Sequence, residues 1–249
     1  MNPSRFGLIL IIATLLIYGL CLFLRNKIKL LPLYKNDSNS KKLQLSLSRS
    51  IEEGKPIHLD VLNRDESQLI APSALVAINT SEQLANRFAA SDEPPFVTNN
   101  SGLVHALTKD AVKMGYRQAD LENEFSAASL DFAGFDSLSH QTTMLGLLEE
   151  TPYAMHLNIG SGGPEIALQD LMFQNEEEIY IAGDCLLGQA TGLATADGVF
   201  IGEQLYELPI VTQPERKEAA PDVGLLVMDI LRYGFIVALG IGALMILLV

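Results

Sequence analysis

Two dense apolar blocks lie at the two ends of the chain and constrain its architecture more than any other feature. The first, Phe6–Leu24, is a run of 19 residues without a charge. A helix of that length rises roughly 28 Å, close to the hydrocarbon thickness of a bilayer. A cleaved signal peptide is the alternative, but its apolar core would be shorter, no small-residue cleavage site follows, and Arg25, Lys27 and Lys29 come next. We expect an uncleaved transmembrane helix over residues 6–24.

The second apolar block, Tyr233–Val249, has 17 residues. A charged side chain costs about 2.5–3.5 kcal/mol at the centre of a membrane helix, so Asp229 and Arg232 indicate the interfacial end of this block. A buried helix of a soluble domain is the alternative. We expect a juxtamembrane turn and a second transmembrane helix within residues 225–249. Small residues recur there at every fourth position and predict close packing on the first span or on a second copy: Gly234, Ala238 and Gly242.

The distribution of Lys and Arg predicts the orientation of both spans. Only Arg5 precedes the first block, whereas six basic residues lie within the linker 25–42, and Arg216, Lys217 and Arg232 precede the second block. Basic loops stay on the cytoplasmic side, so we expect the middle of the chain in the cytoplasm and both termini outside the inner membrane. The linker 25–42 should also lie on anionic headgroups, at about 1 kcal/mol per charge, unless its charges only set the topology.

Between the linkers 25–42 and 212–224, residues 43–211 have the pattern of one cytoplasmic α/β domain. Short apolar runs rich in β-branched residues alternate with longer helical patterns, which predicts βαβ units and a mainly parallel, Rossmann-like sheet of about six strands with helices on both faces. The expected strands are Ile57–Leu62, Pro95–Thr98, Ser129–Ala133, Ala154–Ile159, Glu178–Ala182 and Gly198–Ile201, and the expected helices begin near Leu43, Ser67, Ser101, Asp136, Gly163 and Cys185.

Several residues mark the boundaries of the expected helices. Gly54 is placed to end the first helix at a C′ position, and Asp136 or Ser137 can cap the fourth. Pro164 is placed where a first-turn proline is tolerated.

Three segments resemble a family of bacterial membrane proteins that is known only as a domain of unknown function. They are SRSIEEGKPIH from Ser48, GSGGPEIALQDL from Gly160 and TADGVFIGEQLYEL from Thr195. The resemblance covers residues 44–245 and implies a cytoplasmic α/β domain tied to membrane helices, without implying an activity. The chain differs from the family after the first strand, where Asn63-Arg64-Asp65-Glu66 replaces a glycine-rich turn.

Charge and cysteine content exclude several classes of function. The formal net charge of −13 disfavours nucleic acid as a partner, and the isolated Cys21 and Cys185 support neither a disulfide framework nor a cysteine metal site. From Gln118 to Glu215 there is no Lys or Arg, while 17 Asp and Glu occur. Side chains of that half cannot pair with a pyrophosphate, and we predict no cofactor and no metal. An acidic surface of this kind is commonest for solubility alone.

A ligand of an open parallel sheet binds at the carboxyl ends of the strands. Gly160–Gly163 is the loop there that most resembles a ligand-binding loop. However, Glu165 occupies the third glycine position of a dinucleotide pattern, and no Gly-Lys-Ser/Thr sequence follows. A tight strand-to-helix turn is the favoured alternative for this loop, as helix capping is for Asp136 and Asp184. The candidate ligand-binding residues are Asn99, Asn100, Ser101, Asp136, Gly160, Ser161, Gly162, Gly163 and Asp184.

The four histidines do not form a metal-binding or catalytic pattern. His58 and His156 lie in expected strands, where packed and hydrogen-bonded rings are predicted, and His105 and His140 lie on expected helices. We therefore name no catalytic residue, and an enzyme is the less favoured of the two interpretations. The leading hypothesis is a membrane-anchored interaction, scaffold or accessory module that self-associates or joins other membrane subunits. The alternative is a small-molecule binding or enzymatic domain that uses the crevice at the strand ends.

Overall fold

The computed structural model describes residues 3–24, 38–63, 70–91, 93–148, 151–173, 178–213, 224, 227–228, 230–236 and 239. The chain divides into two compact units. One consists of Met1–Leu33 with Lys217–Val249, and the other is the α/β domain, Tyr34–Arg216.

Six parallel strands form one sheet in the α/β domain, in the order β3-β2-β1-β4-β5-β6. The predicted α/β class and the parallel sheet are confirmed. The strands are β1 (Ile57–Leu62), β2 (Phe96–Asn99), β3 (Leu130–Phe132), β4 (Met155–Gly160), β5 (Glu178–Gly183) and β6 (Gly198–Phe200), each within a residue or two of its predicted bounds.

The strand order gives the sheet a topological switch point between β1 and β4. The chain builds β1, β2 and β3 outward in one direction, then returns to place β4 on the other side of β1 and continues to β6. The longest pairings join β1 to β4 and β4 to β5; the first runs from Ile57 opposite Met155 to Leu62 opposite Gly160. This is the order of Rossmann-like folds, in which ligands bind beside the switch point.

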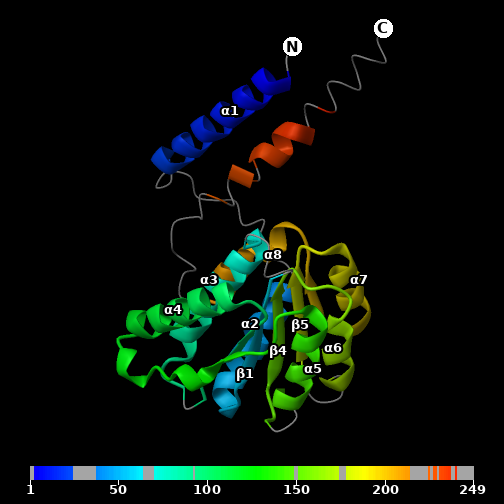
Figure 1. Cartoon of the computed structure of the whole chain (residues 1–249). Coiled ribbons are helices and arrows are strands. Elements are labelled where there is room, and N and C mark those ends of the chain that lie inside the picture. Colours follow the sequence, from blue (N-terminus) through cyan, green and yellow to red (C-terminus); the bar gives the residue numbers. More distant parts are fainter. Residues whose placement is uncertain are drawn as a thin grey trace. The chain divides into compact units, whose positions relative to one another are not determined.

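The large apolar core lies on one face of the sheet. Alternate residues of β1 point to it, namely Ile57, Leu59 and Val61, and all three are fully buried. Figure 1 shows α3 (Pro72–Phe88) and α4 (Gly102–Gln118) on this side of the sheet and α5 (Ser137–Leu148), α6 (Ile166–Phe173) and α7 (Leu186–Thr195) on the other. The helices that contribute to this core are α2 (Ser38–Glu53), α3 (Pro72–Phe88), α4 (Gly102–Gln118) and α8 (Glu203–Val211).

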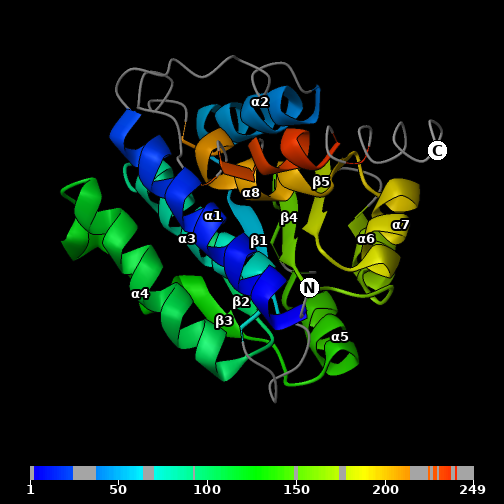
Figure 2. The same cartoon turned by 90° about the horizontal axis from the view of Figure 1, so that it is seen from above.

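The opposite face is covered by α5 (Ser137–Leu148), α6 (Ile166–Phe173) and α7 (Leu186–Thr195). Figure 2 shows α6 and α7 side by side along this face. Among the described residues, two small apolar clusters lie on this face. One contains Leu62, Ile166, Ile179 and Ile181, and the other contains Ala133, Met144, Leu148 and Tyr153. The part of this face between the two clusters is polar.

The structure corrects several predicted helix bounds. The first helix of the domain begins at Ser38 rather than Leu43, because the polar segment before Leu43 packs on the domain: the Asn39 amide donates to the carbonyl of Val199. The second begins at Pro72 rather than Ser67, since the fixed φ of a first-turn proline starts it there. Helix α8 is not among the predicted elements; Pro209 inside it conceals its helical pattern.

The predicted boundary residues have mixed outcomes. Gly54 follows α2 with φ +62°, which confirms the left-handed C′ position. Pro164 lies in a turn before α6 rather than in its first turn, and its carbonyl accepts from the Ala167 N–H at 3.1 Å.

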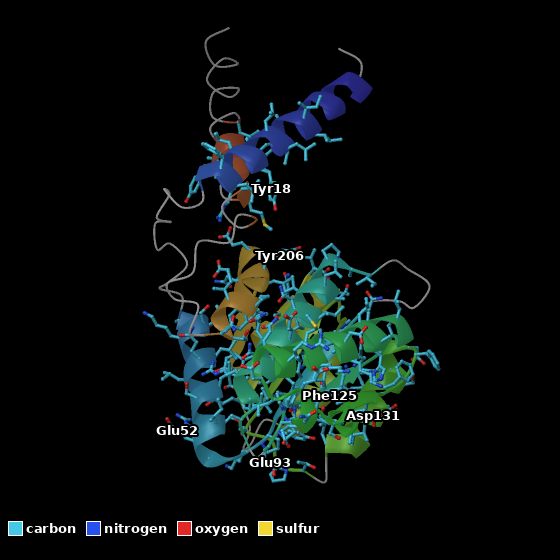
Figure 3. All side chains as sticks on the ribbon, turned by 90° about the vertical axis from the view of Figure 1, so that its left-hand side faces the viewer. Tyr18, Glu52, Glu93, Phe125, Asp131 and Tyr206 are labelled. Carbon is cyan, nitrogen blue, oxygen red and sulfur yellow. The ribbon has the colours of Figure 1, made fainter. Side chains whose placement is uncertain are left out.

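Helix α1 (Pro3–Leu24) has 22 residues and belongs to the other unit. From Ile11 onward most of its large apolar side chains are exposed, with Phe23 at 84%, and Figure 3 shows Tyr18 among them. Among the residues with a described placement, no helix reaches the length and hydropathy needed to cross a membrane. In the expected second span, Gly234 is described and has open space around it, whereas Asp229, Ala238 and Gly242 lie outside the described residues. Residues 25–37 of the basic linker also lie outside them.

We predict that Gly160→Ala destabilises the domain by about 2–4 kcal/mol. Gly160 has φ +131°, and a Cβ there would lie 2.0 Å from the carbonyl oxygen of Leu62 in β1. Urea unfolding of the full chain in detergent, followed by circular dichroism, measures the loss.

The matched control is Gly146→Ala in α5, where no atom lies within 4 Å of the added methyl group. This change should stabilise the helix by up to about 1 kcal/mol. Equal effects of the two substitutions would contradict the close approach of β4 to β1.

Candidate functional site

The ends of β1 and β2 are tied together by two asparagines. The N–H of Asn63 donates to Oδ1 of Asn100 at 2.7 Å, and Nδ2 of Asn100 donates to the carbonyl of Asn63 at 2.6 Å. Asn99 is fully buried and accepts from Thr108 of α4 at 3.2 Å. Ser101 is also buried, at the N-cap of α4, where its side chain makes no capping bond. These residues thus lie together at the carboxyl ends of the strands. The side chains of Asn99 and Asn100, however, are hydrogen-bonded within the domain.

The loop Gly160–Gly163 is packed by the chain itself. The Ser161 N–H donates to the carbonyl of Leu62 at 3.0 Å, and the Gly163 N–H donates to Oε1 of Glu165 at 3.0 Å. The hydroxyl of Ser137 donates to the same carboxylate oxygen. A carboxylate of the chain therefore lies where a phosphate would accept backbone hydrogen bonds in a dinucleotide loop. This geometry matches the tight strand-to-helix turn that the sequence favours.

The two predicted aspartates have different structural roles. Oδ1 of Asp136 accepts the N–H groups of Leu138 and Ser139 at 3.1 and 3.0 Å, so it caps α5 as predicted. These hydrogen bonds, those with Ser139 foremost, hold the pKa of Asp136 below its ordinary value. The capping prediction for Asp184 is wrong: Cys185 is the N-cap of α7, and Asp184 instead accepts from the Ser73 hydroxyl at 2.7 Å. Asp184 thereby links α3 to the end of β5.

A group of buried polar side chains lies on the face of the sheet that α5, α6 and α7 cover. This site was not predicted from the sequence. Eight side chains from five elements belong to it, and each residue is at most 1% exposed. We call this group the polar layer. It consists of His58 and Asp60 of β1, Thr98 of β2, His140 and Gln141 of α5, His156 and Asn158 of β4, and Gln169 of α6.

A continuous chain of hydrogen bonds runs through the polar layer, and it determines the protonation of two rings. The Thr98 hydroxyl donates to Oδ1 of Asp60 at 2.9 Å, so it must accept from Nε2–H of His58, also at 2.9 Å. Nδ1 of His58 is then an acceptor, and Nδ1–H of His156 donates to it at 3.1 Å. The prediction of a packed, hydrogen-bonded ring is confirmed for His58, since both of its nitrogens have partners.

His140 completes the chain from the opposite side. Its Nε2 lies 2.9 and 3.0 Å from the two carboxylate oxygens of Asp60. Burial opposes protonation of His140, but the attraction and hydrogen bond of Asp60 outweigh it and raise the pKa of His140. Burial, followed by repulsion from His156 and His140, lowers the pKa of His58 well below its ordinary value. The pair His140–Asp60 is therefore the charged element of the layer, and His58 is neutral.

A signal for this site is present in two strand sequences. IHLDVL and MHLNIG both place a histidine and a second polar residue two positions apart, and the β1–β4 pairing sets His58 opposite His156 and Asp60 opposite Asn158. Strands buried on both faces are usually apolar throughout, so this alternation marks one polar face. Chemically, the arrangement can hold and pass a proton. In the described part of the chain, no three His, Cys, Asp or Glu side chains are grouped to hold a metal ion.

We predict that His58 makes the domain less stable as the pH falls from 6.5 to 5. Its pKa is depressed in the folded state, so the unfolded chain binds one more proton in this range, and stability falls by about 1.4 kcal/mol per pH unit. The contribution of His140 to stability has the opposite sign. Its raised pKa stabilises the folded state below about pH 6.5, and this stabilisation is lost at higher pH. His140 therefore adds no slope between pH 6.5 and 5.

Urea unfolding of the full chain at a series of pH values measures the slope. The variant His58→Gln should lose the part due to His58, while His105→Gln, which changes a half-buried ring outside the polar layer, should keep it. Identical slopes for the wild type and His58→Gln would contradict this assignment.

Comparison with known proteins adds no identification: no family model, no curated protein and no solved structure matches the chain.

Proposed function

We propose that the chain is a membrane-tethered, Rossmann-like interaction module that associates with a second copy of itself through α7. The observation that carries this proposal is the outward face of α7. Leu186, Leu187 and Leu193 are 80, 63 and 68% exposed on one short helix that carries no charge. Ala190 and Ala194 are exposed on the same helix.

The packing of α7 explains why its leucines face outward. Its buried positions are Gly188 and Gly192, and a Cβ on Gly188 would lie 2.3 Å from the carbonyl oxygen of Gly162. Only glycine permits this approach of the helix to the loop after β4. A surface helix normally turns its apolar side chains toward the core, so an inverted helix of this kind is typical of an interaction surface.

The absence of charge on α7 allows a second copy of the chain to occupy this face. The chain has a net charge of −13, and two copies repel each other wherever their acidic surfaces meet. A two-fold contact through α7 brings together two helices that carry no charge. Anionic lipid is disfavoured because the segment from Gln118 to Glu215, which includes α7, has no Lys or Arg.

The tether is supported by the sequence and by the exposed side chains of α1. Residues 6–24 carry no charge, and the described part of α1 exposes Leu15, Leu16 and Phe23 at 65, 70 and 84%. Such side chains are unfavourable in water and favourable in hydrocarbon. The Lys/Arg distribution supports a cytoplasmic α/β domain with both termini outside, and the family resemblance implies the same arrangement.

The internal bonds at the strand ends also favour interaction over ligand binding. Asn63 and Asn100 bond to each other, Glu165 accepts from the loop after β4, and Asp184 bonds to Ser73. A ligand at the switch point would have to displace these contacts.

Cysteine cross-linking in membranes tests the α7 contact. In a chain with Cys21 and Cys185 replaced by serine, Leu187→Cys or Leu193→Cys should form a disulfide-linked dimer on mild oxidation, because a two-fold axis brings each helix beside its copy. Leu103→Cys on α4, at 60% exposure, is the matched control and should not cross-link.

Adding Leu193→Glu to the Leu187→Cys chain should abolish the cross-link, since a buried unpaired carboxylate opposes the contact. Cross-linking at Leu103 as strong as at α7, or none at either α7 position, would contradict the proposed interface.

The orientation is tested with the natural thiol Cys185, which is partly exposed beside α7. In a Cys21→Ser chain, a membrane-impermeant maleimide should label Cys185 only after sealed, right-side-out vesicles are opened. A cysteine added after Val249 is the control and should react in sealed vesicles. Labelling of Cys185 in sealed vesicles would place the domain on the other side of the membrane.

A further inference from the structure

We propose that the polar layer binds a cluster of internal water molecules between β4, α5 and α6. These waters would complete the hydrogen bonds of His140, Gln141, Asn158 and Gln169. This inference does not depend on the proposed function.

The four side chains come from elements that pack against one another, since α5 contacts α6 and α6 contacts β5 beside β4. Strand pairing places Asn158 between Asp60 of β1 and Ile181 of β5. His140 reaches Asp60 from α5, and Gln141 is the next residue of that helix. In α6, Ile166 packs with Leu62 and Ile181, and Gln169 lies one turn further along. The buried amide of Gln169 is therefore carried to the same level of the sheet as Asn158.

Seven polar atoms of these four side chains are buried without a hydrogen-bond partner among the residues that the structure describes. They are Nδ1 of His140 and both amide atoms of Gln141, Asn158 and Gln169. Folded proteins rarely leave such atoms unpaired, because each has lost its hydrogen bonds to water on burial. Four fully buried side chains with this deficit, on elements that pack against one another, indicate a bound polar ligand between them.

The chemistry of the group selects water as that ligand. Each of the three amides offers both donors and an acceptor, so the ligand must donate and accept. The negative charge of Asp60 is balanced by His140, which leaves no charge in the layer for an ion to neutralise. A metal ion or an anion would therefore be buried without compensation, whereas several waters satisfy donors and acceptors in different directions.

The waters would extend the hydrogen-bond chain of the layer. The chain already connects His156 through His58, Thr98 and Asp60 to Nε2 of His140. Water on Nδ1 of the same ring continues it to the amides of Asn158 and Gln169. The polar layer then forms one connected network from β4 through β1 and back to α6.

A crystal structure of the full chain at about 1.5 Å tests the proposal directly. We expect water density within about 3.2 Å of Nδ1 of His140 and of at least two of the three amides. Direct hydrogen bonds among the four side chains, with no density between them, would overturn it. Density for a metal ion or an organic molecule at the same place would also overturn it, in favour of that ligand.

Magnetic relaxation dispersion of the solvent gives a second test in solution, because it counts long-lived internal waters. Asn158→Leu should lower the count by at least one relative to the wild type, while Asn123→Leu, an exposed control, should not change it. A wild-type count of zero, or an unchanged count in a folded Asn158→Leu protein, would contradict the proposal. If Asn158→Leu does not fold, Gln169→Met serves as the second variant with the same two outcomes.

Discussion

The pairing of β1 with β4 is the contact on which the rest of the α/β domain depends. It joins two strands that are far apart in the sequence along their whole length, and it forms the centre of the sheet. On one face it aligns Leu59 and Leu157 within the large core, and on the other it aligns Asp60 and Asn158 within the polar layer. Beyond its end, Gly160 lets the chain pass close to Leu62 and begin α6. One register therefore determines the core, the polar layer and the switch point together.

Local sequence predicted the elements well because their causes are local. The strand Ile57–Leu62 is an apolar β-prone run after Gly54, and the Asp136 cap follows from hydrogen bonds to residues two and three positions later. The strand order and the polar layer could not be predicted in this way. Asp60 and His140 are 80 positions apart, and only the folded sheet and α5 bring them within 2.9 Å. For the same reason, Asp184 meets Ser73 instead of capping its own helix.

The two faces of the sheet have different physical characters, and this difference separates stability from interaction. The first face is a continuous apolar core and supplies most of the hydrophobic stabilisation. The second is polar at its centre and is closed at the β6 side by α7, whose glycines face the sheet and whose leucines face outward. The surface that we propose for a second copy therefore lies on the side of the sheet that has the smaller apolar core.

The turn after β4 places this domain in an unusual relation to nucleotide-binding folds. Gly160 and Gly162 occupy the first two glycine positions of the dinucleotide pattern, and Glu165 replaces the third. Through its bond to the Gly163 N–H, the Glu165 side chain behaves as a covalently attached substitute for a phosphate group. A side chain of the chain itself thus orders this corner of the fold.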